Sequence, residues 1–157
     1  KEFGSYKILE IEKELNFESS LKKEGLTQNI KLLGHIDRVD LTDQGIRLID
    51  YKTGMVQQNE LNIYDFDQLS KKQKSLQLLF YALLWRKNYN SNEYLQCQII
   101  SLKNTFQPKL NLTYKKKTFI ENDVINNFQI WLDEFLIEIN NTEIFKHDLN
   151  SKYCEIC

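Results

Sequence analysis

Residues 30–54 read IKLLGHIDRVDLTDQGIRLIDYKTG, and this stretch decides the fold. Two segments in which apolar and polar residues alternate, 30–42 and 46–53, flank the short sequence Asp-Gln-Gly at 43–45. Alternation with a period of two is typical of β-strands, and Asp and Gly are common in tight turns. The stretch therefore predicts an antiparallel hairpin that ends at Gly54.

Three charged side chains lie within this otherwise apolar hairpin. Asp50 and Lys52 are two residues apart on the second strand, so they project to the same side, about 7 Å apart along the strand. Asp37 lies on the first strand, where we expect it to face Asp50. Buried charges are costly unless they are paired or bind a metal ion. The three residues form either a structural ion pair, with Lys52 bonded to Asp37 or Asp50, or a site for a hard cation.

The second interpretation has a definite chemistry. Mg²⁺ takes oxygen ligands, often only one or two carboxylates, and keeps several waters. A bound metal ion lowers the pKa of such a water and holds a phosphate oxygen. A lysine beside that water, here Lys52, orients it and offsets the charge that develops on the phosphate. These are the parts needed to hydrolyse a phosphodiester.

The remaining segments predict a mixed α/β fold. Residues 6–18 alternate as a half-buried strand, with Leu9, Ile11 and Leu15 on the face expected to be buried. Residues 55–70 are polar and irregular, and apolar residues recur at helical spacing in two later segments. The order is β-β-β-α-β-β-α, which predicts a central mixed β-sheet flanked by α-helices. The expected elements are strands at 6–18, 30–42, 46–53, 94–102 and 109–114, and helices at 71–88 and 121–140.

Composition is that of an ordinary globular domain. The chain has 157 residues, 41% hydrophobic and 27% charged, so we expect one domain with its own core. No apolar run approaches the roughly 20 residues that cross a bilayer, so we expect no membrane partner. The net charge is −1, which excludes binding to nucleic acid through overall positive charge. Any such contact must use a local basic patch or a metal ion.

The cysteines and the two chain ends suggest a piece of an intracellular protein. There are three cysteines, Cys97, Cys154 and Cys157, and no signal peptide, which favours a reducing, cytoplasmic environment. The sequence starts at Lys1 rather than Met and stops at Cys157. We therefore expect a domain excised from a longer protein, with residues 142–157 as a tail that carries a truncated cysteine motif.

The predicted helix at 71–88 carries polar candidates for the same site. Gln77 and Tyr81 are four residues apart, so they share one helix face and either line a site or pack in the core. Lys71, Lys72 and Lys74 precede them. These lysines are candidates for contacts to DNA phosphates, and the alternative is a solvated charged surface.

In this order, the motifs GHID (34–37), DYK (50–52) and QLLFY (77–81) resemble the RecB-type nuclease domain of the PD-(D/E)XK superfamily. More narrowly, they are similar to the C-terminal nuclease domain of AddB-type helicase–nuclease subunits. The resemblance spans residues 12–81, and the C-terminal half offers only a compatible order of elements. It implies a restriction-endonuclease-like core and a single nuclease domain over residues 1–157.

The resemblance also implies roles on the hairpin. Asp37 and Asp50 match the two metal-ligating acids, and the main-chain carbonyl of Tyr51 matches a further ligand. Lys52 matches the catalytic lysine. The implied cofactor is Mg²⁺ or Mn²⁺.

Further roles lie on the flanking elements. Gln77 and Tyr81 match residues that line the catalytic site and contact DNA. Glu12 resembles an acidic metal ligand on the strand before the hairpin, with Glu10 and Glu14 as alternatives on the same strand face.

Two departures from the family pattern affect the metal ligands. The family usually places a metal-binding histidine on a helix upstream, and residues 1–5 contain none. His35 shares a strand face with Asp37, but we do not assign it to the site, and we expect Arg38 and Asp40 to form a structural pair. Many relatives also carry an iron–sulfur centre on four cysteines. This chain has three cysteines, so we expect such a cluster only in a longer parent chain.

The implied function is metal-dependent hydrolysis of DNA, not of a small molecule. The resemblance predicts an exonuclease domain that acts with a helicase domain or subunit in DNA end processing and recombinational repair. One alternative is a stand-alone RecB-like exonuclease of the CRISPR-adaptation type. Another is a non-catalytic module that binds DNA or docks a partner on the same fold.

Overall fold

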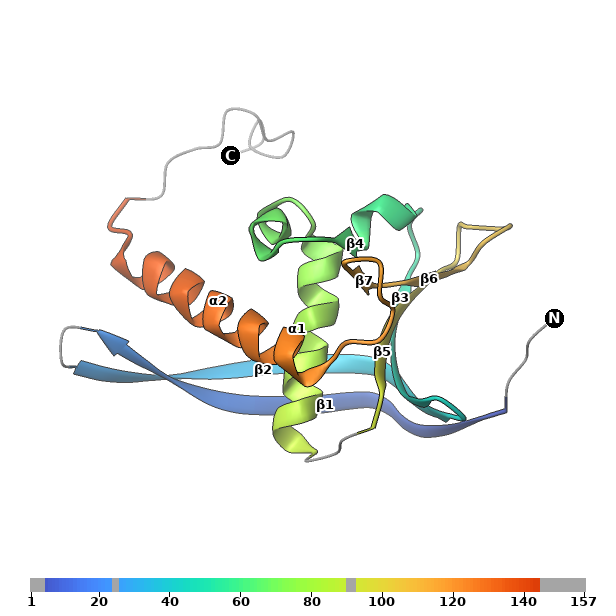
Figure 1. The fold of residues 1–157 in the computed structure, drawn as a ribbon, viewed down its shortest axis with the longest axis horizontal. Helices are drawn as coiled ribbons and strands as arrows, with labels where there is room; N and C mark the ends of the chain where they lie inside the picture. Colours follow the sequence, from blue (N-terminus) through green and yellow to red (C-terminus); the bar gives the residue numbers. More distant parts are fainter. Residues whose placement is uncertain (1–4, 24–25, 90–92, 145–157) are drawn as a thin grey trace.

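A five-stranded mixed sheet forms the centre of the computed structural model, which describes residues 5–23, 26–89 and 93–144. The strand order is β1-β2-β3-β5-β6, with β3 and β5 parallel and the other neighbours antiparallel. Figure 1 shows β1 and β2 running as a long ribbon beyond the other strands. The bounds are β1 (Tyr6–Lys23), β2 (Leu26–Thr42), β3 (Gly45–Lys52), β5 (Leu95–Ser101) and β6 (Lys109–Asn111).

Two helices pack on this sheet, α1 (Gln73–Asn88) and α2 (Asn122–Asn141). Helix α1 crosses the ribbon, and α2 lies beside it (Figure 1). A hydrogen bond of 2.7 Å from Ser19 Oγ to Asp133 Oδ1 joins β1 to α2. The predicted mixed α/β fold with a central sheet flanked by helices is therefore confirmed.

Helix α1 is buried around most of its circumference rather than along a single stripe. Leu78, Leu79, Ala82, Leu83 and Leu84 are all fully buried. The reason is that α1 contacts the sheet, α2 and the short 3₁₀ helix η2 (Phe66–Ser70) that precedes it. A helix enclosed in this way can hold polar side chains such as Gln77 and Tyr81 against the sheet.

The first half of β1 does not bury the face that alternation predicted. Leu9 is 39% exposed and Ile11 is 64% exposed, whereas Leu15 is buried. The pairing of β1 with β2 shifts register between Ile8 and Glu10, and Glu12 has a φ of 50°. Such irregularities interrupt the strict alternation of side chains along a strand. The predicted buried face is therefore wrong before Glu12 and right after it.

The segment 55–70 is more ordered than its polar sequence suggests. It contains the 3₁₀ helices η1 (Gln58–Glu60) and η2 (Phe66–Ser70) and the strand β4 (Asn62–Ile63), which pairs with β7 (Thr113–Tyr114). Leu61, Ile63 and Leu69 are fully buried there. The three follow no single period, because Leu61 caps the end of η1, Ile63 lies in β4 and Leu69 lies in η2.

Of the three cysteines, the structure describes Cys97 alone. Residues 145–157, with Cys154 and Cys157, lie outside the described residues. Cys97 is buried in β5, and burial raises the pKa of its thiol to about 12, as for an unreactive core cysteine. No helix in the described ranges is long and apolar enough to cross a membrane.

Candidate functional site

The hairpin strands β2 and β3 separate at the candidate site. Their last paired residues on this side are Arg38 and Ile49, and one step further the register sets Asp37 opposite Asp50. Beyond the ladder, the Tyr51 N–H donates a hydrogen bond of 2.7 Å to Asp37 Oδ2. The Asp37 carboxylate thus takes the place of a main-chain acceptor where the strands part, which fixes it beside Asp50.

Asp50 is a buried carboxylate with little compensation for its charge. It is 2% exposed, and its Oδ2 forms an ion pair of 2.8 Å with Lys52 Nζ. Apart from this ion pair, Oδ2 accepts no well-oriented hydrogen bond from the described residues. Burial raises the pKa of Asp50, the negative charge of Asp37 raises it further, and Lys52 lowers it. The predicted approach of Asp37, Asp50 and Lys52 is therefore present in the structure.

A chain of polar contacts links Lys52 to α1. Lys52 Nζ donates a hydrogen bond of 2.8 Å to Gln77 Oε1, and Gln77 Nε2 donates one of 2.8 Å to the Tyr81 hydroxyl. An ammonium group only donates, so the amide oxygen of Gln77 must face Lys52 and its NH₂ must face Tyr81. The Tyr81 oxygen is then an acceptor, and its own proton is free for another partner.

The Tyr81 hydroxyl is affected by three of the predicted acids, Asp50, Asp37 and Glu12. Burial raises the pKa of its hydroxyl, and the charges of Asp50, Asp37 and Glu12 raise it further, while the bond from Gln77 lowers it. The hydroxyl therefore stays protonated near neutral pH and serves as a hydrogen-bond donor or acceptor.

Gly34 explains how α1 brings Tyr81 to this position. A Cβ atom added at Gly34 would lie 2.7 Å from Leu84 Cδ1 and 3.4 Å from Tyr81 Cε1. Both residues belong to the buried part of α1. The absence of a side chain at Gly34 therefore lets the helix pack directly against β2, and the glycine of the GHID sequence has a packing reason.

Glu12 lies beside the site in a strained conformation. Its φ of 50° is in the left-handed region that side-chain-bearing residues rarely adopt. The β1–β2 pairs on either side of it set Glu12 opposite Asp37, and its charge contributes to the raised pKa of Tyr81. Strain of this kind, about 1–3 kcal/mol, is concentrated at functional sites.

The two alternative acids on β1 have other partners. Glu10 forms an ion pair of 3.3 Å with Lys13. Glu14 contacts His35 Nε2 at 3.0 Å, with more than half of each side chain exposed. Of the three β1 acids, Glu12 is therefore the one that the structure associates with the site, and His35 lies in an exposed pair with Glu14.

The donor set suits a hard divalent cation that keeps much of its water. Within the described ranges, no three side chains of His, Cys, Asp or Glu come together closely enough to hold a metal ion. Mg²⁺ is commonly held by only one or two carboxylates, with water in its other positions. Asp37 and Asp50 supply two carboxylates, and the under-compensated charge of Asp50 favours a cation beside it. The carboxylates of Asp37 and Asp50 therefore fit such an ion, with Glu12 nearby.

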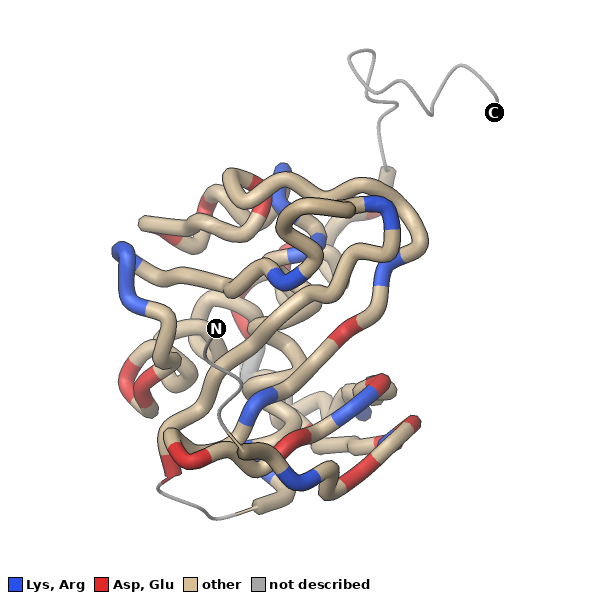
Figure 2. Tube along the Cα trace, turned by 90° about the vertical axis from the view of Figure 1, so that its right-hand side faces the viewer, with Lys and Arg blue, Asp and Glu red and all other residues tan. Residues whose placement is uncertain are grey.

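The three lysines before Gln77 differ in their surroundings. Lys71 and Lys74 line a pocket that also includes Lys52 and Gln77. Lys72 instead donates to the main-chain carbonyl of Asn62. Figure 2 shows basic and acidic residues interspersed along the trace on the side that it draws.

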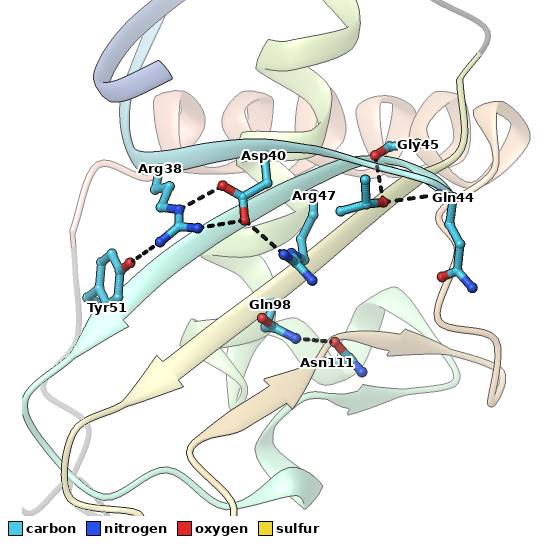
Figure 3. Close-up of polar contacts among 9 residues, drawn as sticks. Arg38, Asp40, Gln44, Gly45, Arg47, Tyr51, Gln98 and Asn111 are labelled. Carbon is cyan, nitrogen blue, oxygen red and sulfur yellow. Dashed lines mark hydrogen bonds and ion pairs between the residues drawn. The ribbon is translucent and has the colours of Figure 1, made fainter. Parts of the chain in front are cut away.

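The opposite side of the hairpin holds a second charged cluster (Figure 3). Asp40, fully buried, accepts hydrogen bonds of 2.7 and 3.0 Å from Arg38 and one of 2.8 Å from Arg47. Arg38 also donates to the Tyr51 hydroxyl at 3.2 Å. The predicted pair of Arg38 and Asp40 is present. Arg47 was not predicted to join this cluster, although its place two residues before Ile49 on a buried strand could have indicated a paired charge.

The comparison with protein families agrees with this geometry. The PD-(D/E)XK nuclease superfamily matches residues 1–157, the whole chain, so the chain belongs to that superfamily. Its members are typically metal-dependent nucleases. No curated protein and no solved structure matched the chain.

Proposed function

We propose that this chain is a Mg²⁺- or Mn²⁺-dependent deoxyribonuclease whose site is formed by Asp37, Asp50, Lys52, Gln77 and Tyr81. The observation that carries the proposal is the connected set of contacts from Asp50 through Lys52 and Gln77 to Tyr81, beside Asp37. A purely structural ion pair would need only one acid for Lys52. Here a second acid lies next to the first and raises its pKa.

Each residue has a chemical task in this proposal. Asp37, Asp50 and the Tyr51 carbonyl hold the divalent ion, with Glu12 as a further oxygen donor. When bound, the ion lowers the pKa of a water and withdraws charge from a phosphate oxygen. Lys52 orients the attacking water and offsets negative charge on the phosphate. As water attacks phosphorus, the bond from phosphorus to the leaving oxygen breaks, and that oxygen takes up a proton.

The α1 residues position the reacting groups and the DNA. Gln77 restricts the Lys52 ammonium by accepting its hydrogen bond. Because Gln77 also donates a hydrogen bond to the Tyr81 oxygen, the proton of the Tyr81 hydroxyl can point toward the substrate. That proton is available to a phosphate oxygen. Lys71, Lys72 and Lys74 are proposed to contribute positive charge next to the DNA.

We further propose an exonuclease that acts with a helicase partner in the cytoplasm, in DNA end processing and recombinational repair. The support is the resemblance of the ordered motifs at 34–37, 50–52 and 77–81 to AddB-type nuclease domains. Linear and covalently closed circular DNA of the same sequence test the exonuclease assignment. We expect loss of the linear form only, and equal loss of the closed circle would contradict it.

The experiment that tests the nuclease itself compares three proteins. The wild-type chain, Lys52→Ala and Asp50→Ala are incubated with linear DNA and Mn²⁺. We expect each substitution to slow cleavage by roughly 10²–10⁴-fold, because each removes a group that acts in the transition state. Circular dichroism establishes that the variants are folded. Equal DNA loss in all three samples would identify a contaminating nuclease, and DNA binding without cleavage would favour a non-catalytic module.

A further inference from the structure

A cationic pocket of about 310 Å³ adjoins the candidate site at the start of α1. Lys52 and Gln77 belong both to this pocket and to the proposed catalytic site, so the two spaces are continuous. Its lining holds three lysines against one glutamate, which gives it an excess of positive charge. The lining residues are Lys52, Glu60, Lys71, Gln73, Lys74 and Gln77.

The start of α1 adds to this positive charge. The helix begins at Gln73, its first turn contains no acidic residue, and the N-cap Lys72 makes no side-chain capping bond. A helix N-terminus carries a partial positive charge, so lysines there are unfavourable and anions are favourable. The sequence therefore concentrates cations at the positive end of the helix, an arrangement that a bound anion stabilises.

The two lysines that this pocket does not share with the catalytic site differ in their freedom. Lys74 pairs with the Glu60 carboxylate, whose Oε1 also accepts a hydrogen bond of 2.8 Å from the Gln57 N–H. Lys71 is exposed and has no ion pair among the described side chains. Lys71 is therefore available to contact an anion, whereas Lys74 is already paired with Glu60, which lines the same pocket.

We infer that this pocket binds an internal phosphate of the DNA strand, next to the phosphate that is cleaved. Lys71 contacts that phosphate, and Glu60 occupies Lys74 until the DNA arrives. The inference rests on the proposed nuclease function and adds a second phosphate contact to it. It also separates Lys71 from Lys72, because the Lys72 ammonium is bonded to the Asn62 carbonyl and does not line the pocket.

The test measures DNA binding without cleavage. Fluorescence anisotropy in EDTA gives the dissociation constant of a labelled duplex at several salt concentrations, for the wild-type chain, Lys71→Ala, Glu60→Gln and Lys31→Ala. Lys31 is an exposed lysine on the β1–β2 ribbon and serves as the matched control. Glutamine at position 60 can keep the capping contact with Gln57, because Gln also serves in capping boxes.

The expected results have opposite signs for the two pocket variants. Each lost phosphate contact lowers the slope of log affinity against log salt by about 0.9, so we expect Lys71→Ala to lower it by about one. Glu60→Gln frees Lys74, and we expect binding to tighten roughly 2- to 5-fold. Lys31→Ala should leave the slope close to that of the wild type.

The inference would be overturned by an unchanged slope in Lys71→Ala, by an equal loss in Lys31→Ala, or by weaker binding of folded Glu60→Gln. Duplexes with 5′-hydroxyl and 5′-phosphate ends are measured in parallel. A Lys71 effect confined to the phosphorylated ends would also overturn the assignment to an internal phosphate. Mn²⁺-dependent cleavage by the same wild-type preparation reports separately on the proposed nuclease function, so the two failures are distinguishable.

Discussion

Two buried aspartates on neighbouring strands, Asp40 and Asp50, have very different surroundings. Both are nearly inaccessible, at 0% and 2% exposure. Asp40 binds two arginines, Arg38 and Arg47, with three hydrogen bonds. Asp50 has a single ion pair, to Lys52, and a second acid beside it. The charge of Asp40 is therefore more than balanced by two arginines, whereas Asp50 and the neighbouring Asp37 have one lysine beside them.

This difference distinguishes a structural charge from one that we propose to bind a metal ion. Buried charges need good geometry and satisfied hydrogen bonds to be tolerated, and Asp40 has both. Asp50 keeps a deficit of positive charge that a divalent cation would remove. Buried acids with such a raised pKa and a specific charged partner are candidates for functional sites. We infer that the side of the hairpin with Asp40 stabilises the fold and that the side with Asp50 forms the proposed catalytic site.

Tyr51 connects the two regions. Its main-chain N–H holds Asp37 on the site side, and its hydroxyl accepts a hydrogen bond from Arg38 on the other. The residue next to both acids thus serves the site through its backbone and the structural cluster through its side chain.

The largest effect on stability is expected at the structural aspartate. Asp40→Ala leaves Arg38 and Arg47 without their shared partner, which should lower the free energy of unfolding by about 2–3 kcal/mol. The two arginine side chains are 18% and 20% exposed, so water recovers part of the loss. Urea denaturation measures the change. Asp43→Ala, in the exposed turn, is the control, and an equal change in both variants would break the comparison.

A smaller loss is expected where α1 packs on the hairpin. Gly34→Ala places a methyl group 2.7 Å from Cδ1 of Leu84, which is fully buried, and this should destabilise the fold by about 1–2 kcal/mol. Cleavage should fall less than stability, because the added methyl group meets Tyr81 Cε1 at an ordinary contact distance of 3.4 Å. Gly54→Ala is the matched control, since a Cβ atom there meets nothing within 4 Å. Thermal unfolding and cleavage are measured for both, and a harmless Gly34→Ala would refute the packing explanation.

Removing the reactive charge should stabilise the metal-free fold. The pKa of Asp50 is raised above its ordinary 3.8, so the folded chain binds this proton more tightly than the unfolded chain. Its contribution to stability is then full below about pH 3.8 and is lost as pH rises through the raised pKa. In EDTA at pH 7, Asp50→Asn should therefore unfold at a higher temperature than the wild type.

The pH dependence provides the control for this prediction. The advantage of Asp50→Asn should shrink toward zero as the pH is lowered to the ordinary pKa of the carboxyl, whereas Asp43→Asn should show no such trend. A variant less stable than the wild type at pH 7 in EDTA would mean that Lys52 fully compensates Asp50. The contrast with Asp40 would then disappear.

The smallest effect is expected at the Tyr51 side chain. Tyr51→Phe removes a hydrogen bond of 3.2 Å on a side chain that is 40% exposed. Stability should change by no more than about 0.5 kcal/mol, and the cleavage rate should stay close to that of the wild type, because the site uses only the Tyr51 main chain. A large loss of cleavage with intact stability would show that the tyrosine ring takes part in the reaction.

Local patterns in the sequence predicted much of the fold and the residues that the candidate site brings together on the hairpin and on α1. The Asp-Gln-Gly turn and the alternation around it gave the β2–β3 hairpin, whose register brings Asp37 next to Asp50. The apolar spacing after Lys71 gave α1, which brings Gln77 and Tyr81 to Lys52. These elements were predictable because each is set by residues close in sequence.

Other features depend on contacts between distant segments. The left-handed backbone at Glu12 alters which side chains of β1 are buried. No neighbouring glycine or proline in the sequence predicts this conformation. Leu61 is buried in the common hydrophobic core beside a turn whose Glu60 carbonyl accepts a hydrogen bond from Ser75 of α1, and no period in its own segment predicts this. Lys71 and Lys72 are adjacent in sequence, yet one lines the pocket and the other binds a carbonyl of β4.

Binding of Mn²⁺ tests the central claim most directly. Crystals of the chain are soaked in Mn²⁺, and anomalous diffraction locates the ion. The contrast between the two aspartates predicts a peak next to Asp37 and Asp50 and none next to Asp40. A well-occupied peak elsewhere, with no density beside Asp37 and Asp50, would contradict the assignment of these acids to the metal.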